Sequence, residues 1–440
     1  MNEQSSPQLH RTLGFWAITA YGVGDILGAG IYALVGEVAG RAGDATWLAF
    51  LVTVAIAGLT ALSYAELSGR FPRSAGEAKF CLQATGWKWF ALLIGLLVFA
   101  SGLVSLATVS RACAGYALGP WPRIAESPVW QSAVVVAFLL LLAAINFQGI
   151  RLSSNVNIAC TLIEAGGLVT VIVAGAWFLA GDAPRAAPGE AAVGWSWLGV
   201  LQGSALAFFA FIGFEDMVNV AEEVKRPKRN LPAAILTAVS VAAITYIIVA
   251  WIATSVIPPD QLAASNAPLL AVVQKSAPSI PAWSFTLVAL FAVANTGLLN
   301  FIMGSRLLYG MAAQGLLPRW LHAVHPRTRT PHRSIVLILL LVVGLALSGT
   351  LAGLAGTTNV LLLVVFTSVH VSLLLLKRRG KGFRVPKIIP AAGAIACIAL
   401  IGFAPPRSIL LALAIIAVAA VAVVVWMRRF HGNVALPEEK

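Results

Sequence analysis

Gly22-Val23-Gly24-Asp25-Ile26-Leu27-Gly28-Ala29-Gly30-Ile31-Tyr32, in the first long apolar segment of the chain, contains four glycines and one acid. Each glycine weakens a helix by about 1 kcal/mol relative to alanine, and a helix inside lipid must satisfy its backbone groups internally. The glycines could instead serve close packing between helices, as in a Gly-x-x-x-Gly motif. Because Asp25 lies in the same stretch, we expect the helix to break here, with its freed N–H and C=O groups facing protein, water or a ligand.

A second interruption is predicted halfway along the chain, at Phe208-Phe209-Ala210-Phe211-Ile212-Gly213-Phe214-Glu215-Asp216. In membrane proteins, interrupted apolar segments at corresponding positions of two halves point to a binding site near the middle of the bilayer. The two stretches together therefore predict such a site between them.

The composition is that of an all-α polytopic membrane protein. Of the 440 residues, 59% are hydrophobic and 11% are charged, and the mean hydropathy is +0.88, whereas a soluble domain carries about 25% charged residues. No soluble domain is evident. An enzyme is the weakest interpretation, because no His-Glu-x-x-His, Gly-x-Ser-x-Gly or paired catalytic aspartate motif occurs.

Apolar runs of roughly 20 residues predict about twelve membrane-spanning helices. Their expected ranges are 14–38, 45–68, 89–118, 128–148, 155–180, 196–220, 233–257, 282–312, 334–354, 357–376, 388–404 and 408–428. The first apolar run lacks a cleavage site and is expected to remain as a span. An even number of spans puts both termini on one side of the membrane.

The net charge of +13 follows this topology and does not indicate a nucleic-acid partner. With a cytoplasmic N-terminus and alternating spans, most of the 30 basic residues lie in cytoplasmic connections or at the cytoplasmic termini. The other side holds Arg41, Arg123, Arg185, Lys275 and Arg407, while Arg111 and Arg306 lie within or at the ends of spans. This positive-inside pattern predicts a multi-pass protein of the cell (inner) membrane with both termini in the cytoplasm.

Neither the cysteines nor the loop histidines predict a metal site. The cysteines have no paired spacing, which favours small core residues; they are Cys81, Cys113, Cys160 and Cys397. The basic loop 317–334 contains His322, His325 and His332. Its Pro/Arg/Thr-rich surroundings favour contact with phosphate or anionic lipid over metal binding, as in the basic segment 377–387.

Two polar connections are predicted to be solvated. After the second span, Glu66 and Arg70 have the i,i+4 spacing of an exposed ion pair. After the sixth span, residues 219–232 mix acids and bases, with Asn230 as a helix N-cap and Pro232 close to the first turn of the next span.

Four stretches together resemble the amino acid–polyamine–organocation (APC) superfamily of secondary transporters, close to its branch of cationic amino acid and polyamine permeases. They are Gly-Ala-Gly-Ile at 28–31, Tyr-Ala-Glu-Leu to Phe-Pro-Arg-Ser at 64–74, Gly-Phe-Glu with Ala-Glu-Glu-Val-Lys-Arg-Pro-Lys-Arg-Asn-Leu-Pro at 213–232, and Ser-Arg-Leu-Leu-Tyr to Gly-Leu-Leu-Pro at 305–318. These motifs follow the family's order across most of the chain, and jointly they are specific.

The resemblance implies the inverted-repeat fold of the sodium-coupled leucine transporter, called LeuT-like, with discontinuous helices 1 and 6. In that fold spans one to five and six to ten are related by a pseudo-two-fold axis. The expected organisation is a single transmembrane domain over 1–440, with repeats at 14–180 and 196–376 and two additional helices at 388–428.

The resemblance also implies which residues bind the substrate. N–H groups of the first break, from Leu27 through Ile31, would hold an α-carboxylate, and carbonyls of both breaks would hold the α-amino group. The expected binding set is Ile26, Leu27, Gly28, Ala29, Gly30, Ile31, Phe208, Phe211, Ile212, Gly213 and Glu215. Helix dipoles support the scheme, because half-helix N-termini are positive and exposed carbonyls negative.

Two acids are candidates for proton coupling. In proton-coupled relatives a lysine of the fifth span takes the place of sodium, and alignment puts Glu164 at or next to that lysine. Asp25 also replaces a small or hydroxylated residue. Two carboxyl groups close together in low dielectric cannot both be charged, so one could bind and release a proton. The alternative is that Asp25 and Glu164 only brace helices.

Further groups near the breaks have several possible roles. Glu215 could brace the unwound backbone, contact a cationic substrate group or join the proton path together with Asp216. For His370, in the tenth span, a core hydrogen bond is favoured over a proton relay. Phe208 and Phe211 could cover the site as a gate.

The function predicted from these features is proton-coupled transport of amino acids by alternating access, with no cofactor beyond the coupling proton. Sodium coupling is less expected, because carboxylates are unusual at that fold's sodium site. An exchanger of basic amino acids or polyamines is the alternative mechanism. A substrate sensor or assembly subunit is the alternative class; the expected partners are a small solute and membrane lipid.

Overall fold

The computed structural model describes residues 13–72, 76–148, 154–181, 196–218, 220–313, 317–328, 330–377 and 382–429. Several basic positions that contribute to the predicted topology lie outside these residues: Arg11, Arg73, Arg151, Arg185, Arg329, Arg378, Arg379, Lys381 and Lys440. Within the described ranges the regular structure is helical, apart from an isolated parallel bridge between Leu13 and Val224. The predicted all-α fold is confirmed for this part of the chain.

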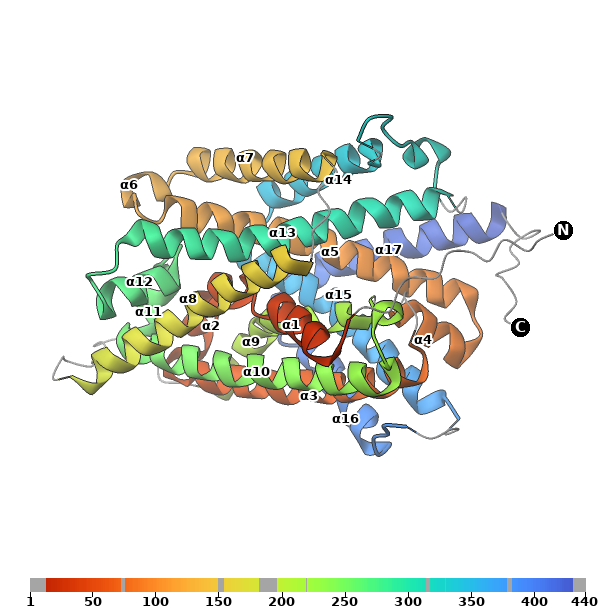
Figure 1. The fold of residues 1–440 in the computed structure, drawn as a ribbon, viewed down its shortest axis with the longest axis horizontal. Coiled ribbons are helices and arrows are strands. Elements are labelled where there is room, and N and C mark those ends of the chain that lie inside the picture. The colour runs from red at the N-terminus through yellow and green to blue at the C-terminus, as the bar shows by residue number, and fades with distance from the viewer. Residues whose placement is uncertain are drawn as a thin grey trace.

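Helices occupy all twelve predicted spans (Figure 1). They are α1 (Phe15–Ile26) with α2 (Ala29–Ala42), α3 (Thr46–Arg70), α5 (Lys88–Leu118), α7 (Pro128–Phe147), α8 (Ser154–Ala180), α9 (Trp197–Ala207), α10 (Pro227–Val256), α13 (Ala282–Ala313), α14 (His332–Ser348), α15 (Leu351–Leu375), α16 (Ile388–Ile401) and α17 (Pro406–Arg429). Nine stretches of the described residues are long and apolar enough to cross a membrane, and α14 and α16 are shorter apolar helices. The chain is a multi-pass membrane protein.

Short helices connect the spans or follow the second break. They are η1 (Gly43–Ala45), α4 (Gly76–Thr85), α6 (Pro122–Ala125), η2 (Phe208–Phe211), η3 (Phe214–Val218), η4 (Ala221–Glu223), α11 (Pro259–Ala264), α12 (Pro268–Ser276) and η5 (Arg319–His322). In Figure 1 the long helices run roughly parallel to the horizontal axis, with α3 beside α10 and with α1, α2 and α9 in the middle. Most residues of α2 and α9 are buried, so these halves of the broken spans lie inside the bundle.

The turn between the ninth and tenth spans differs from the prediction. The expected ranges placed it near residue 355, but α14 ends at Ser348 and α15 begins at Leu351. The Thr350 side chain caps α15 by accepting the Gly353 N–H at 3.1 Å. The helix start is set by this cap, which fixes the first turn of α15 at a position that the pattern of apolar residues does not mark.

The seventh span also begins earlier than predicted, at Pro227 and not near 233. Pro227 occupies the first turn, where its missing N–H costs nothing. Asn230, expected to be the N-cap, lies inside the helix and donates its side-chain amide to the Lys225 carbonyl at 2.6 Å. Pro232 is consequently inside α10, which continues through it.

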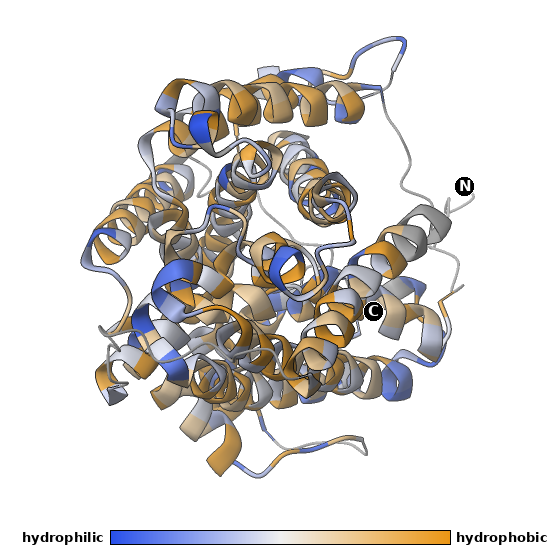
Figure 2. Ribbon diagram, turned by 90° about the vertical axis from the view of Figure 1, so that its left-hand side faces the viewer, coloured by the Kyte–Doolittle hydropathy of each residue, from blue (hydrophilic) through white to orange (hydrophobic). Residues whose placement is uncertain are grey.

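The surface of the bundle is apolar along the helices. Figure 2, seen along the bundle, shows hydrophobic residues over most helical surfaces and hydrophilic residues mainly in connections and at helix ends. Large side chains such as Trp177, Val129 and Ile395 are 70–82% exposed. Extended exposed apolar surface is unfavourable in water and expected where helices face lipid.

Glu66 is buried, which corrects the interpretation of this acid and Arg70 as a solvated pair. The Glu66 side chain is 3% exposed and forms an ion pair with Arg70. Its second carboxylate oxygen accepts the Val385 N–H at 2.7 Å. Val385 precedes α16, so this carboxylate ties the end of α3 to the connection between α15 and α16. The i,i+4 spacing predicted the pair correctly but could not show the distant third partner.

Replacing Glu66 with alanine should destabilise the protein by about 3–5 kcal/mol, because removing one partner of a buried pair leaves the other uncompensated. Glu66→Gln should cost less, since its amide oxygen can still accept the Val385 N–H. Thermal unfolding of detergent-purified protein measures both effects, with Glu126→Ala at an exposed acid as control. Equal melting temperatures for Glu66→Ala and Glu126→Ala would contradict the assignment.

Candidate functional site

The first break separates α1 from α2 and is held by side chains of distant helices. Gly28 is the N-cap of α2, with φ −59° and ψ −144°. The Ala29 N–H donates to Thr296 Oγ1 on α13 at 3.2 Å. On the other side, the Tyr246 hydroxyl on α10 donates to the Ile26 carbonyl. These bonds satisfy backbone groups that the interruption frees, as a break inside a bilayer requires.

The second break follows α9, where the chain tightens into η2 and then turns at Gly213. Gly213 has φ +127°, a conformation that favours glycine. Its N–H donates to Glu215 Oε2 at 2.8 Å. Glu215 therefore braces the unwound backbone, one of the roles considered from the sequence. Asn359 on α15 holds the preceding turn by donating to the Ala205 carbonyl at 2.6 Å.

The main chains of the two breaks contact each other directly. A Cβ added at Gly30 would collide with the backbone of Ala210. A Cβ added at Gly213 would lie 2.8 Å from the carbonyl carbon of Asp25, closer than real contacts allow. Glycine is required at both positions because one main chain packs on the other.

Of the N–H groups predicted to hold a carboxylate, two are already engaged. Leu27 donates to the Val23 carbonyl at 2.8 Å, and Ala29 donates to the threonine of α13. Gly30 and Ile31 belong to the first turn of α2, whose N–H groups have no partner inside the helix. With Gly28 at the N-cap, these two donors form the positive end of α2.

A cavity of about 490 Å³ reaches the second break from the side of α4 and the C-terminal half of α13. Glu77, Glu215 and Asp216 bring three carboxyl groups to its wall, and Arg306 is its basic residue. Its neutral polar lining comprises Ser101, Ser105, Asn300 and Thr358. Among the predicted binding residues, Ile212 and Glu215 line this cavity, so it connects directly with the second break.

Asp25 and Glu164, the predicted coupling pair, are not hydrogen-bonded to each other. Glu164 is fully buried, and its Oε1 accepts the Asn295 amide at 3.0 Å. One carboxylate oxygen of each acid, Asp25 Oδ2 and Glu164 Oε2, is buried without a hydrogen-bond partner among the described residues. The second break also lies close to Asp25, because Gly213 packs on the Asp25 carbonyl group.

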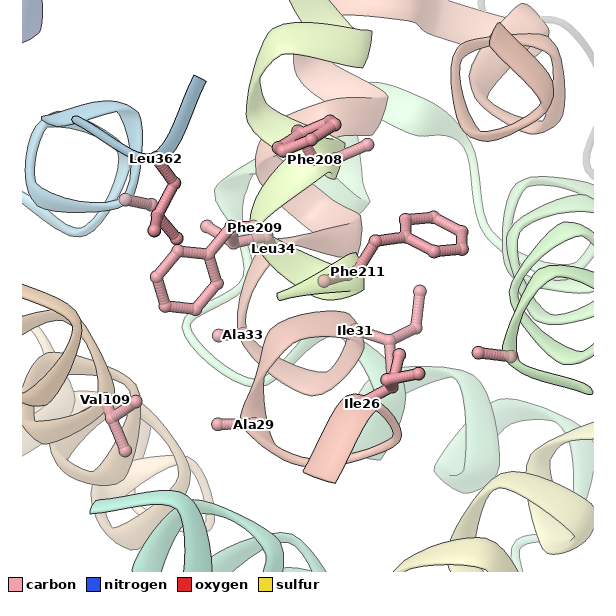
Figure 3. Packing of buried hydrophobic residues seen from close by; sticks show 14 of the residues in the cluster. Ile26, Ala29, Ile31, Ala33, Leu34, Val109, Phe208, Phe209, Phe211 and Leu362 are labelled. Atoms are coloured by element: carbon pink, nitrogen blue, oxygen red, sulfur yellow. The ribbon is translucent and has the colours of Figure 1, made fainter. Parts of the chain in front are cut away.

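The aromatic residues proposed as a gate are packed in the core. Phe208 and Phe211 are fully buried. Phe211 makes an edge contact with Tyr246, with ring centroids 5.1 Å apart. Figure 3 shows Ile26 and Ile31 of the first break beside Phe211, with Phe208 one turn away in η2. These rings lie between the breaks and other helices and do not line the cavity.

His370 forms the core hydrogen bonds favoured from the sequence. Ser63 Oγ lies 2.9 Å from Nδ1, and Thr60 Oγ1 lies 3.2 Å from Nε2. Both ring nitrogens therefore have partners on α3, and the ring packs against Gly393 of α16. This histidine fastens α15 to its neighbours.

Several polar anchors of the breaks were missed in the sequence, namely Thr296, Tyr246, Asn295 and Asn359. Each lies in an apolar span and binds a group more than 130 residues away. Polar side chains inside spans commonly hydrogen-bond across helices. A single polar residue in an apolar span indicates that a hydrogen-bond partner exists on another helix. The sequence does not show which residue that partner is.

Glu77 is a further site residue that sequence reasoning missed. It lies on α4, outside the spans, and is 4% exposed. Its Oε1 accepts the Tyr64 hydroxyl at 3.0 Å. Burial raises the pKa of Glu77 to about 7, and the charge of Asp216 acts in the same direction. The acid at this cavity wall therefore titrates near neutral pH.

The stability of the protein should reflect this shift. Because the folded pKa of Glu77 exceeds its ordinary value of 4.5, the folded state binds more protons, and stability falls as pH rises from about 4.5 through 7. Between pH 5 and 8 this group should lower the free energy of unfolding by about 3 kcal/mol. Thermal unfolding across this range should show a smaller decline for Glu77→Gln. Parallel curves for variant and parent would refute the shift.

The histidine-containing loop shows ring packing. His322 stacks on Tyr309 with ring centroids 4.7 Å apart, and His325 packs on Phe147 at 5.0 Å. In the part of the chain that the structure describes, no group of three or more His, Cys, Asp or Glu side chains is arranged to hold a metal ion.

The fold and the site define a class. Two of the twelve spans are interrupted side by side, and a cavity leads to the interruption from one end of the bundle. Freed main-chain dipoles at the centre of a helical membrane bundle are the arrangement that transporters use for small solutes. The chain is a membrane transporter and not an enzyme.

Comparison with known proteins identifies the family. The amino acid permease family matches residues 13–428. An uncharacterized transporter of Mycobacterium tuberculosis is 33% identical over 406 residues, 91% of this chain and 88% of that protein. Cationic amino acid transporter 4 of Mus musculus is 33% identical over 398 residues, 85% of this chain and 61% of that protein. The methylthioribose transporter of Bacillus subtilis is 26% identical over 423 residues, 90% and 89% of the two chains. The chain belongs to the amino acid permease family, in the APC superfamily, close to the cationic amino acid branch.

Proposed function

We propose that this protein carries amino acids across the cell membrane by proton-coupled alternating access, with a preference for cationic amino acids. The observation that carries the preference is the 490 Å³ cavity at the second break, where Glu77, Glu215 and Asp216 present carboxyl groups. Acidic walls attract a cationic side chain and disfavour anionic solutes. The relative named as a cationic amino acid transporter supports the same class.

In this proposal the substrate lies between the two breaks. Its α-carboxylate meets the N-terminus of α2 at Gly28, Gly30 and Ile31, where the helix dipole is positive. Its α-amino group meets carbonyls of the breaks, and its side chain extends into the acidic cavity. Glu215, which braces Gly213, lies where the backbone and the cavity meet.

The coupling proton binds the acids near the first break, Asp25 and Glu164. A proton can drive the cycle only if it binds with different affinity in the outward and inward states. One carboxyl oxygen of each acid is buried with no hydrogen-bond partner among the described residues, which supports this role. Protonation would turn that oxygen into a hydrogen-bond donor or remove the buried charge. The repeats at 14–180 and 196–376 would move against each other, with both termini in the cytoplasm.

Uptake into proteoliposomes tests the proposal. L-[14C]arginine should accumulate when the lumen is alkaline, and unlabelled lysine should compete while alanine and methylthioribose compete weakly. Glu77→Gln and Asp216→Asn should weaken arginine uptake by up to roughly tenfold, since each removes a carboxyl group facing the substrate cation. The loss in Glu77→Gln should grow as the external pH rises through about 7, because the parent carboxyl group is then ionised. Glu126→Gln should have no effect. Uptake of alanine or methylthioribose in preference to arginine would overturn the cationic preference.

An exchanger of basic amino acids or polyamines is the second candidate, and the acidic cavity supports it equally. Vesicles preloaded with unlabelled arginine, without a pH gradient, distinguish the mechanisms. Exchange requires internal substrate, whereas symport responds to the pH gradient in empty vesicles.

A further inference from the structure

A second cavity, of about 210 Å³, lies on the opposite side of the breaks from the acidic cavity. The two cavities share no lining residue. The second is bounded by α2, α5, the start of α7 and the connection between α11 and α12. Along α2 it begins at Ala33 and reaches Glu37, eight residues beyond Ala29 and so roughly 12 Å from the first break. It is separate from the proposed transport site.

Two opposite charges face this cavity without pairing. Glu37 of α2 and Arg111 of α5 both line it. The described residues contain one ion pair, between Glu66 and Arg70, and none between Glu37 and Arg111. Neither side chain forms a hydrogen bond or an ion pair with any described residue, although the charge of Arg41, four residues along α2, acts on Glu37 from a longer distance. An arginine inside an apolar span is costly unless a partner or function compensates it, so the missing partner points to a ligand.

The rest of the lining suits a small polar molecule. Alanines and glycines at Ala33, Gly36, Ala112 and Gly115 leave space between the charges. Gln131, Ser265, Asn266 and Thr350 add neutral hydrogen-bonding groups. The volume equals roughly seven water molecules at about 30 Å³ each, enough for an amino acid's charged end but not for a large solute.

We propose that this cavity is a second binding site, which takes the α-carboxylate of a free amino acid on Arg111 and its α-ammonium group on Glu37. A guanidinium binds a carboxylate through two parallel hydrogen bonds, and the carboxylate of Glu37 accepts from the ammonium group. One zwitterion satisfies both protein charges at once. A lone anion or cation would leave one of them unpaired.

The site would hold a solute on the side facing away from α4, before or after it occupies the transport site. The proposal depends on the proposed function only for the choice of amino acids as probes. Because the recognised groups are common to all amino acids, this site should accept L-arginine and L-alanine alike, unlike the acidic cavity.

Binding to the full-length protein in nanodiscs tests the proposal. Equilibrium dialysis with L-[14C]alanine and L-[14C]arginine should show residual binding in Gly28→Leu, in which the transport site is blocked. Adding Arg111→Gln or Glu37→Gln to that variant should weaken the residual binding by roughly tenfold or more, while Arg111→Lys keeps part of it. Arg123→Gln, at an exposed arginine that lines neither cavity, should have no effect.

A second measurement avoids dependence on Gly28→Leu folding. In otherwise unaltered protein, Ser265→Cys places a thiol at the cavity wall. The rate at which a membrane-impermeant thiol reagent labels this cysteine should fall severalfold when L-alanine is present. Labelling of the four native cysteines in the parent protein gives the background to subtract. Arg111→Gln should abolish that protection.

The outcomes separate the two proposals. Protection and residual binding without arginine uptake would support the second site and overturn the proposed function. Arginine uptake with neither protection nor residual binding would overturn the second site and leave the function intact. Protection that persists in Arg111→Gln and Glu37→Gln would also overturn it.

Discussion

Replacing Glu164 with glutamine should abolish the response of uptake to a pH gradient while substrate binding persists. Glu164 Oε1 already accepts the Asn295 amide, an interaction that a glutamine oxygen can keep. Oε2 is buried without a partner among the described residues. A carboxylate there can gain and release a proton, whereas an amide cannot. The structural bond is thus retained and the titratable group removed.

The measurement is L-[14C]arginine uptake by proteoliposomes with and without an alkaline lumen. The ratio of the two rates should fall close to unity in Glu164→Gln, while binding in equilibrium dialysis changes little. Asn295→Ala is a useful comparison, because it removes the hydrogen bond and leaves the acid. If Glu164→Gln accumulates substrate as the parent does, Glu164 is not the coupling group. Asp25→Asn then tests the other acid.

Replacing Gly213 with alanine should remove transport. The residue has φ +127°, which an L side chain adopts only with strain. Its new Cβ would also lie 2.8 Å from the carbonyl carbon of Asp25 and 2.9 Å from the oxygen. Strain and overlap of about 3 kcal/mol would lower the population of the correctly assembled site, and with it the apparent affinity for substrate, by roughly 100-fold. The two breaks would have to separate to admit one methyl group.

Controls for Gly213→Ala are available in the same chain. Gly58 and Gly344 lie in spans and have no neighbouring atom within 4 Å of an added Cβ. Alanine at either position should leave arginine uptake unchanged. Gly28→Leu should behave like Gly213→Ala, since a side chain there meets Thr296. Normal uptake by Gly213→Ala would exclude close packing of the breaks as a requirement for transport.

The spans and both interruptions could be predicted because their signals are local. Length and apolar content define a span, and glycines near Gly28 and Gly213 weaken one at a specific place. The family motifs also lie within short stretches. These features depend on residues that are neighbours in sequence. Helix ends were predicted less accurately: Thr350 caps α15, α10 already begins at Pro227, and α2 continues to Ala42, beyond the predicted end at residue 38.

The partners of the site could not be predicted because they join distant segments. Thr296 binds a backbone group 267 residues away, and Tyr246 one 220 residues away. Glu66 has a local spacing that fits an exposed pair, yet its environment is set by Val385. The approach of Gly213 to the Asp25 carbonyl likewise depends on how the second break folds over the first. The spacing of residues in the sequence does not show which distant segments come into contact in the folded chain.

The bridge between Leu13 and Val224 joins the start of the first interrupted span to the segment that follows the second interrupted span and leads into α10. The Leu13 N–H donates to the Glu223 carbonyl at 3.0 Å, and the Lys225 N–H donates to the Leu13 carbonyl at 2.8 Å. If α1 tilts away from the bundle, either both hydrogen bonds break or residues 220–225 move with α1. Breaking them has a net cost of about 0.5–1.5 kcal/mol for each bond. This pairing couples the beginning of the first interrupted span to the end of the second, so that movement of α1 is transmitted to the segment between the second break and α10.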